Sequence, residues 1–262
     1  MIFDAKYRRD KELIAVNVVT PNASETKIIC QFGYENMRLL IRIWNLHITY
    51  PFLDIVLHVN DVKSCFRQLK HHPDVMGAFS HILGEFLFLQ CGLTFGSDFS
   101  PASWEVIRRV AEQLAEAFFD DKSLRKKHWK HLDQLRWDRT LGRSQSGFVP
   151  ANACGLNKGV LDNDGNPVNT PHAFFVDDDL YSDVFDIERI AQAIAASIKA
   201  IFVLLGESDL LSRQDPISFD KMVDTIVSHR NIILGQHIDT RKMTVETPPA
   251  RVSISLMRNV FL

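Results

Sequence analysis

Short runs of apolar and β-branched residues recur along the chain and predict strands. Residues 12–20, 52–59 and 231–234 each form such a run, and the first run stops at a Pro-Asn pair that is typical of a turn. A looser alternation around Gly84, over residues 79–89, predicts a hairpin. These patterns predict a chain with several short strands.

Apolar residues at three- and four-residue steps predict helices between these strands. Ser100 suits the N-cap of one such helix, and Pro101 suits its first helical position. Asp186 is the expected cap of another helix, which Gly206 ends. The predicted helices cover residues 34–44, 101–118, 187–205 and 219–228.

Carboxylates are concentrated where two of the predicted strands end. Asp61 follows the run at 52–59, and the three consecutive acids at 177–179 end a strand that begins at residue 172 and returns over 180–184. Adjacent carboxylates repel one another unless water or a cation compensates them. If the two strands are neighbours, both acidic ends project from the same edge and offer hard oxygen ligands for Mg²⁺. The alternative interpretation of the acidic triplet is a solvated turn.

Composition and charge narrow the class of protein. The chain has 262 residues, of which 46% are hydrophobic and 24% charged, so we expect one large folded domain or two smaller ones. The formal net charge of −2 excludes a globally basic nucleic-acid coat protein. Residues 122–143 are locally basic, however, and contain Trp129 and Trp137. This segment predicts either a contact to a phosphate backbone or a solvated helix face.

The lack of a secretory signal pattern and the spacing of the cysteines predict an intracellular protein, in the cytoplasm or nucleus. No membrane partner is expected. Charged residues near Met1 occupy the place of the apolar core of a secretory signal, and no apolar run is long enough to span a membrane. Cys30, Cys65, Cys91 and Cys154 form no closely spaced pair. We therefore expect buried thiols in a reducing compartment and no structural zinc site.

Four segments, taken in order, resemble motifs of retroelement reverse transcriptases, such as those of LTR-type retrotransposons. Residues 61–69 (Asp-Val-Lys-Ser-Cys-Phe-Arg-Gln-Leu) resemble the first palm motif, in which an Asp precedes an aromatic residue by five positions. Residues 93–104 resemble the Leu-Pro-Phe-Gly loop with its following Pro-started helix, and 175–178 (Phe-Val-Asp-Asp) are similar to the Tyr-x-Asp-Asp hairpin. Residues 233–235 (Ile-Leu-Gly) resemble the segment near the primer grip. Each motif alone is weak, whereas the four in order are specific, and the resemblance covers about residues 1–250.

The resemblance implies an α+β fold. Its centre would be a polymerase palm, a mainly antiparallel sheet backed by helices, with abbreviated fingers and little or no thumb. The fingers would comprise about residues 1–51 and 75–95, and the palm about 52–74 and 96–238. Residues 239–262 would begin a thumb or form a tail. The 65-residue gap from Ile107 to His172 implies an insertion in the palm.

The resemblance also implies a metal site. Asp61 and Asp177 would bind two Mg²⁺ ions, or Mn²⁺ ions in their place, and Asp178 would be a supporting acid. The backbone carbonyl of Val62 would supply a further oxygen ligand.

Three further residues would bind the incoming nucleotide. Phe66 would lie under the sugar and exclude a 2′-hydroxyl, although a helix residue of this kind can equally be buried in the core. Gly96, which lacks a Cβ, would let the backbone approach the nucleotide or template closely. Lys221 would lie near the triphosphate.

The implied function is that of an RNA-directed DNA polymerase, a nucleotidyltransferase that adds deoxynucleotides to a primer 3′-hydroxyl. Its partners would be an RNA or DNA template with a primer and deoxynucleoside triphosphates, and the chain could continue into a larger polyprotein. The alternative is a catalytically inactive, truncated retroelement remnant that still binds nucleic acid. A palm-type cyclase or primase is a third interpretation, but it gives no reason for the Phe-Gly loop and the Pro-started helix.

Overall fold

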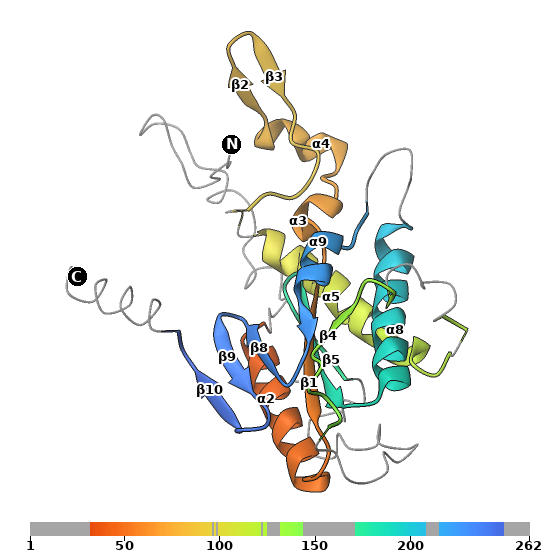
Figure 1. Cartoon of the computed structure of the whole chain (residues 1–262). Coiled ribbons are helices and arrows are strands. Elements are labelled where there is room, and N and C mark those ends of the chain that lie inside the picture. The colour runs from red at the N-terminus through yellow and green to blue at the C-terminus, as the bar shows by residue number, and fades with distance from the viewer. Residues whose placement is uncertain are drawn as a thin grey trace, which may run out of the picture.

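A computed structural model describes residues 32–95, 97, 99–121, 123–124, 132–143, 171–207 and 215–248. Over these residues the protein is α+β, with helices and mainly antiparallel strands (Figure 1). The helices are α2 (Phe32–Thr49), α3 (Cys65–Gln68), α4 (Pro73–Met76), the 3₁₀ helix η1 (Gly77–Phe79), α5 (Phe99–Phe118), α8 (Ile187–Leu205) and α9 (Phe219–Asp224). The strands are β1 (Ile55–Asp61), β2 (His81–Leu83), β3 (Phe86–Phe88), β4 (Arg136–Trp137), β5 (His172–Phe175), β6 (Asp178–Val184), β7 (Ile226–Val227), β8 (Arg230–Ile233), β9 (Gln236–Asp239) and β10 (Thr244–Glu246).

The central sheet has the strand order β1-β6-β5, and both pairings are antiparallel. Successive side chains of a strand point to opposite faces, so the apolar run in β1 needs cover on both sides. Val56 packs in one buried cluster with Trp104 of α5 and Ile194 of α8. Leu57 packs in a second cluster with Leu39 of α2 and with residues of β8 and β9. The sheet is thus enclosed by α5 and α8 on one face and by α2 and the second sheet on the other.

Buried charges join α2 to α5. Glu35 is fully buried and accepts from Arg38 Nη1 at 2.8 Å and from Arg108 Nη1 at 3.1 Å. Arg108 also donates to the Phe174 carbonyl at 3.2 Å, which fixes α5 to the end of β5. Burial, followed by the charge of Glu112, raises the pKa of Glu35 to about 7. Hydrophobic periodicity cannot detect this contact, because buried charged residues have the sequence pattern of a solvated face.

The second sheet, β10-β9-β8, lies beside the first. Ser228 forms an isolated antiparallel bridge with Leu57, and Arg241 donates to both Asp54 oxygens at 2.8 and 2.9 Å. The hairpin of β2 and β3 instead projects from the body (Figure 1). Its large apolar side chains are exposed, with Ile82 at 76% and Phe86 at 71%.

Several predicted elements are confirmed. The helix expected at 34–44 is part of α2, and the hairpin expected at 79–89 contains β2 and β3. Asp186 caps α8 by accepting from the Arg189 N–H at 3.0 Å, and Gly206 ends the helix with a φ of 91°.

Three predictions about where helices and a turn begin or end are wrong. Helix α5 begins at Phe99, and Ser100 Oγ donates to the Thr94 carbonyl at 2.7 Å instead of capping the helix. The short helix expected at 219–228 ends at Asp224, because β7 follows and pairs with β4. The turn in the acidic hairpin comes earlier than predicted, since Asp178 already belongs to the returning strand.

The expected burial of all cysteines is also wrong. Cys65 is buried, but Cys91 is exposed because it follows the projecting hairpin, and both are free thiols. Cys30, Cys154 and the strand predicted at 12–20 lie outside the described residues. Across the ranges given above, no helix is both long enough and apolar enough to cross a membrane.

Candidate active site

The central sheet brings the predicted carboxylates together. Asp61, the last residue of β1, pairs in register with Asp178, the first residue of β6. Directly opposed residues of an antiparallel pair lie on the same face, with Cβ atoms roughly 5 Å apart. Asp177 occupies the turn beside them, and its carbonyl accepts from the Val62 N–H at 2.7 Å. The structure therefore places Asp61, Val62, Asp177 and Asp178 at one end of the sheet.

The turn that carries Asp177 has a strained backbone and is held from outside. Val176 has a φ of 53°, in the left-handed region, which is unfavourable for a β-branched residue. Its carbonyl accepts from Nε1 of Trp104, a side chain of α5 that is only 1% exposed. A buried helix residue thus fixes the position of the acidic turn.

Lys221 lies at the same end of the sheet, where its ammonium forms an ion pair with Asp61 Oδ1. The segment before α9 is fixed to the end of β1, because Ser218 N–H donates to the Asp61 carbonyl at 2.8 Å and Ile217 bridges Val62. The hydrogen bond to Asp61 is the main cause that raises the pKa of Lys221. The Lys221 side chain is nevertheless 63% exposed, so it is free to adopt other positions.

Negative charge in this group is only partly compensated. Burial, followed by the charges of Asp177 and Asp61, raises the pKa of Asp178 to about 6, and Lys221 opposes the shift only in part. Burial also raises the pKa of Asp177, with a smaller contribution from Asp61. A raised carboxyl pKa means that the ionised form is disfavoured. A cation near these oxygens would therefore be bound favourably.

Asp179 has a different environment from its two neighbours. Its Oδ1 contacts His172 Nδ1 at 2.7 Å, and its Oδ2 accepts from Ser197 Oγ at 2.5 Å and from Asn60 Nδ2 at 3.3 Å. Burial alone would raise the pKa of Asp179, but the charge of His172 and these hydrogen bonds lower it below its ordinary value. The three acids form a single group in the sequence, and no sequence pattern indicated a role for His172 or Ser197. Strand alternation from residue 178 onward would have separated Asp179 from Asp178.

The predicted nucleotide-binding residues have mixed outcomes. Phe66 is 6% exposed and belongs to the main hydrophobic cluster, as the core interpretation expects. Its ring makes an edge contact with Phe95 at a centroid distance of 5.0 Å, and Phe95 is 51% exposed. Phe95 is therefore the exposed member of this pair, and Phe66 is the buried one. Gly96 lies outside the described residues.

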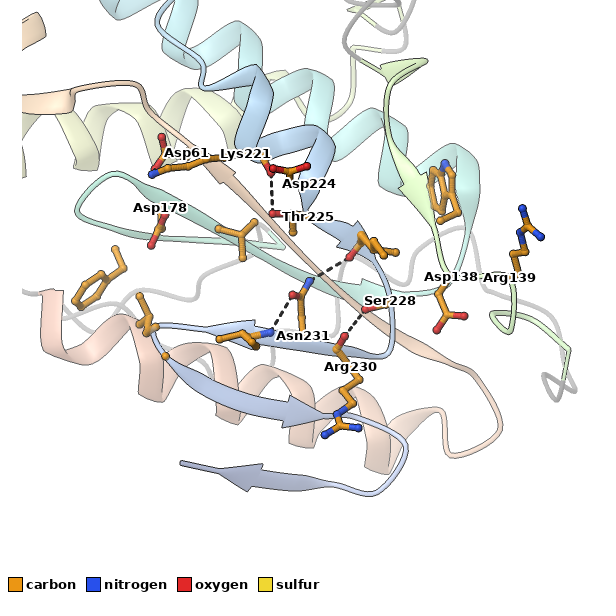
Figure 2. A pocket seen from close by; sticks show the side chains of 17 residues that line it. Asp61, Asp138, Arg139, Asp178, Lys221, Asp224, Thr225, Ser228, Arg230 and Asn231 are labelled. Atoms are coloured by element: carbon orange, nitrogen blue, oxygen red, sulfur yellow. Dashed lines mark hydrogen bonds and ion pairs between the residues drawn. The ribbon is translucent and has the colours of Figure 1, made fainter. Parts of the chain in front are cut away.

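A pocket of about 1130 Å³ opens beside the carboxylates. Figure 2 shows Asp61, Asp178 and Lys221 near one end and Arg139 and Arg230 at the other. Leu234 and Gly235, from the segment that resembles the one near the primer grip, line the same pocket. Leu234 was expected to end a strand, but it lies in the turn after β8. Leu234 and Gly235 have φ values of 49° and 75° between the paired strands β8 and β9. Two successive positive φ values are characteristic of a tight type I′ hairpin turn.

The donor chemistry of this end suits a hard divalent cation. Asp61, Asp177 and Asp178 offer carboxylate oxygens whose repulsion a cation would relieve, and Lys221 already supplies one positive charge there. Within the described part of the chain, no group of three or more His, Cys, Asp or Glu side chains is arranged as a ready-made metal site. Binding through all three acids would thus need side-chain movement, including release of Lys221 from Asp61.

Comparisons with protein-family models, with curated proteins and with solved structures gave no match to this chain.

Proposed function

We propose that this chain is an RNA-directed DNA polymerase domain of the reverse transcriptase type, with the central sheet as its palm. The observation that supports the proposal best is the in-register pairing of Asp61 with Asp178 beside the turn that carries Asp177. Asp61 and Asp178 open onto a pocket that the Leu234-Gly235 turn also lines, and Trp104 of the remaining motif segment holds the acidic turn. Residues from the four motif segments would in this way serve one reaction.

In the proposed reaction the primer 3′-oxygen bonds to the α-phosphorus of a deoxynucleotide, and pyrophosphate leaves as the bridging P–O bond breaks. Asp61, Asp177 and Asp178 would hold Mg²⁺ or Mn²⁺. Bound ions of this kind activate the attacking oxygen and stabilise the leaving one. Lys221 would leave Asp61 and contact the triphosphate, which its exposure and its single ion pair permit. Trp104 would keep the acidic turn in position through the Val176 carbonyl.

Primer extension tests this proposal. With poly(rA)/oligo(dT) and either Mg²⁺ or Mn²⁺, we expect the wild type to extend the primer and the double variant Asp177→Asn/Asp178→Asn to lose extension. Asp220→Asn is the matched control, because Asp220 is an exposed acid of α9 outside the pocket. The proposal fails if a folded wild type does not extend the primer, or if the double variant extends it as well as the control.

The ion pair between Lys221 and Asp61 favours a second candidate, an inactive nucleic-acid-binding remnant. This contact neutralises Asp61 without a metal ion, and a protein with no catalytic task could keep it permanently. Calorimetric titration with Mn²⁺ separates the two functions. The polymerase should bind Mn²⁺ and lose this binding in Asp61→Asn, whereas the remnant should bind a primer–template without binding the metal.

A further inference from the structure

One wall of the pocket comes from the long segment between α5 and β5. Within it, β4 pairs in parallel with β7, and the Asp138 N–H donates to the Val227 carbonyl at 2.9 Å. Trp137 and Arg139 line the pocket from this wall. For the basic segment 122–143, one interpretation of the sequence was a solvated helix face. Over residues 132–143 the structure instead has mainly a short strand and turns, and part of this segment lines the pocket.

This wall is attached to the body at several points. The carboxylate of Asp138 contacts His229 at 2.9 Å, and the Gly142 N–H donates to Asp54 Oδ2 at 2.8 Å. Arg241 reaches the Thr140 carbonyl at 2.9 Å and holds Asp54 as well. Trp137 packs edge-to-face on Phe185 at 6.4 Å. Such attachments give a wall of defined shape rather than a loose loop.

Two arginines line the pocket away from Asp61 and have no role in the proposed reaction. Arg139 and Arg230 are exposed and line the pocket, and neither forms a side-chain hydrogen bond or ion pair within the ranges that the structure describes. Asp138, the nearest acid in the wall, is already paired with His229. Figure 2 shows both arginines away from Asp61, so this end of the pocket presents two cations without a side-chain partner among the described residues. Trp137 lines the pocket as well, two residues before Arg139 in the chain.

The register along β1 gives the spacing between the two ends. Ser228, two residues before Arg230, bridges Leu57, which lies four residues before Asp61. At roughly 3.3 Å per strand residue this separation is about 13 Å. Successive phosphates of one strand in a duplex are about 3.4 Å apart along the axis, so this separation exceeds one nucleotide step. A strand that reacts at Asp61 would therefore reach this end of the pocket a few nucleotides away.

We propose that Arg139, Arg230 and Trp137 bind the sugar–phosphate backbone of a nucleic-acid strand a few nucleotides from the end that reacts at Asp61. The arginines would contact phosphates, and Trp137 would pack on a base or sugar. The position of the reacting end rests on the proposed function, whereas the binding itself does not. An acidic peptide is the competing ligand, but only in a nucleic-acid strand does each phosphate come with a base on which Trp137 can stack.

The salt dependence of binding tests the arginine contacts. Binding of a fluorescent primer–template is measured by anisotropy over a range of salt concentrations, without divalent metal or nucleotide. Each lost phosphate contact lowers the slope of log K against log salt by about 0.9, so Arg139→Ala/Arg230→Ala should lower it by about 1.8. Arg143→Ala is the matched control, because Arg143 is exposed in the same segment but outside the pocket. Trp137→Leu should weaken binding roughly tenfold with an unchanged slope.

A second measurement locates the contact. Single neutral methylphosphonate linkages are placed at successive primer positions, and the loss of affinity should peak at one internal position, a few steps from the 3′ end. This peak should disappear in Arg139→Ala/Arg230→Ala, because the contacted charge is then absent from the protein.

Three outcomes overturn the proposal: an unchanged slope in the double variant, an equal fall in Arg143→Ala, or displacement of the duplex by poly-glutamate as effectively as by unlabelled DNA. The two proposals can fail separately. A wild type that extends primers with no arginine dependence retains the proposed function alone. A wild type with the expected slopes but no extension retains only the binding surface.

Discussion

Asp178 and Asp179 are neighbours in the chain, yet they lie on opposite faces of the same strand and differ in almost every physical property. Asp178 faces the pocket beside Asp61, and its pKa is raised to about 6. Asp179 is 1% exposed, accepts from three side chains, and has a lowered pKa. Identical residues thus acquire opposite tasks from strand alternation alone. Asp179 stabilises the hairpin, and Asp178 retains a destabilised charge that can serve a cation.

The comparison predicts its largest effect at Asp61, the cross-strand partner of Asp178. Asp61→Asn should lower primer extension by at least ~10³-fold, since it removes a ligand that contributes several kcal/mol to the transition state. Its urea midpoint should change little, because relief of the like-charge repulsion with Asp178 offsets the loss of the ion pair with Lys221. Asp224→Asn, an exposed acid on the pocket wall, is the control and should keep its activity. Full activity of Asp61→Asn would show that the face of the sheet toward the pocket has no catalytic role.

On the opposite face, Asp179→Ala should lower the free energy of unfolding by about 3–5 kcal/mol, because it leaves His172 buried without its charged partner. Ser197 and Asn60 lose their acceptor as well. Urea denaturation followed by circular dichroism measures the loss. The same substitution at Asp178 is the control and should cost far less. Equal losses at the two positions would show that the faces do not differ as described.

The difference in stability between Asp178→Asn and the wild type should depend on pH. A carboxyl whose folded pKa is raised above its unfolded value costs stability as pH rises through the interval between them, here from roughly 4 to about 6. The variant should therefore match the wild type below about pH 4 and exceed it by about 1–2 kcal/mol above pH 6, after allowance for solvent screening. Thermal unfolding at several pH values gives the curve. A constant difference at all pH values would contradict the assigned cause.

Lys221→Met should give the smallest change. The ion pair with Asp61 is largely exposed on the lysine side, so we expect a loss of stability of less than about 1 kcal/mol. Binding of Mn²⁺ should become tighter, because Asp61 no longer has an internal competitor, and calorimetry measures both affinities. Lys242→Met, which alters an exposed lysine outside the pocket, is the control. Weaker Mn²⁺ binding in Lys221→Met alone would mean that Lys221 supports the metal site instead of competing with it.

Local signals predicted much of the fold from the sequence. The apolar run before Asp61, the cap at Asp186 and the stop at Gly206 depend on neighbouring residues only, and the structure contains all three. The common end of the two acidic segments was expected only if β1 and β5 were neighbours. The structure places β6 between them, and Asp61 pairs with Asp178 of β6 instead.

Long-range features could not be predicted. The position of the acidic turn was missed by two residues, and this shift decided which acid faces the pocket. The contact of Lys221 with Asp61 and the wall at Trp137 join segments that are distant in the chain. The buried pair of Glu35 and Arg108 looks like a solvated surface in any periodicity analysis. The roles of all the site residues, and the boundaries of palm and fingers, stay predictions.

The projecting β2–β3 hairpin has a practical consequence for handling the protein in concentrated solution. Ile82, Phe86 and Leu87 are each more than 60% exposed, and strands of three residues leave unpaired backbone groups at their edges. An apolar edge of this kind is a template for pairing between copies. The concentration at which the protein stays monodisperse should therefore be limited by the β2–β3 hairpin rather than by the net charge. Leu87→Lys, placed far from the carboxylates, should raise the concentration at which light scattering begins.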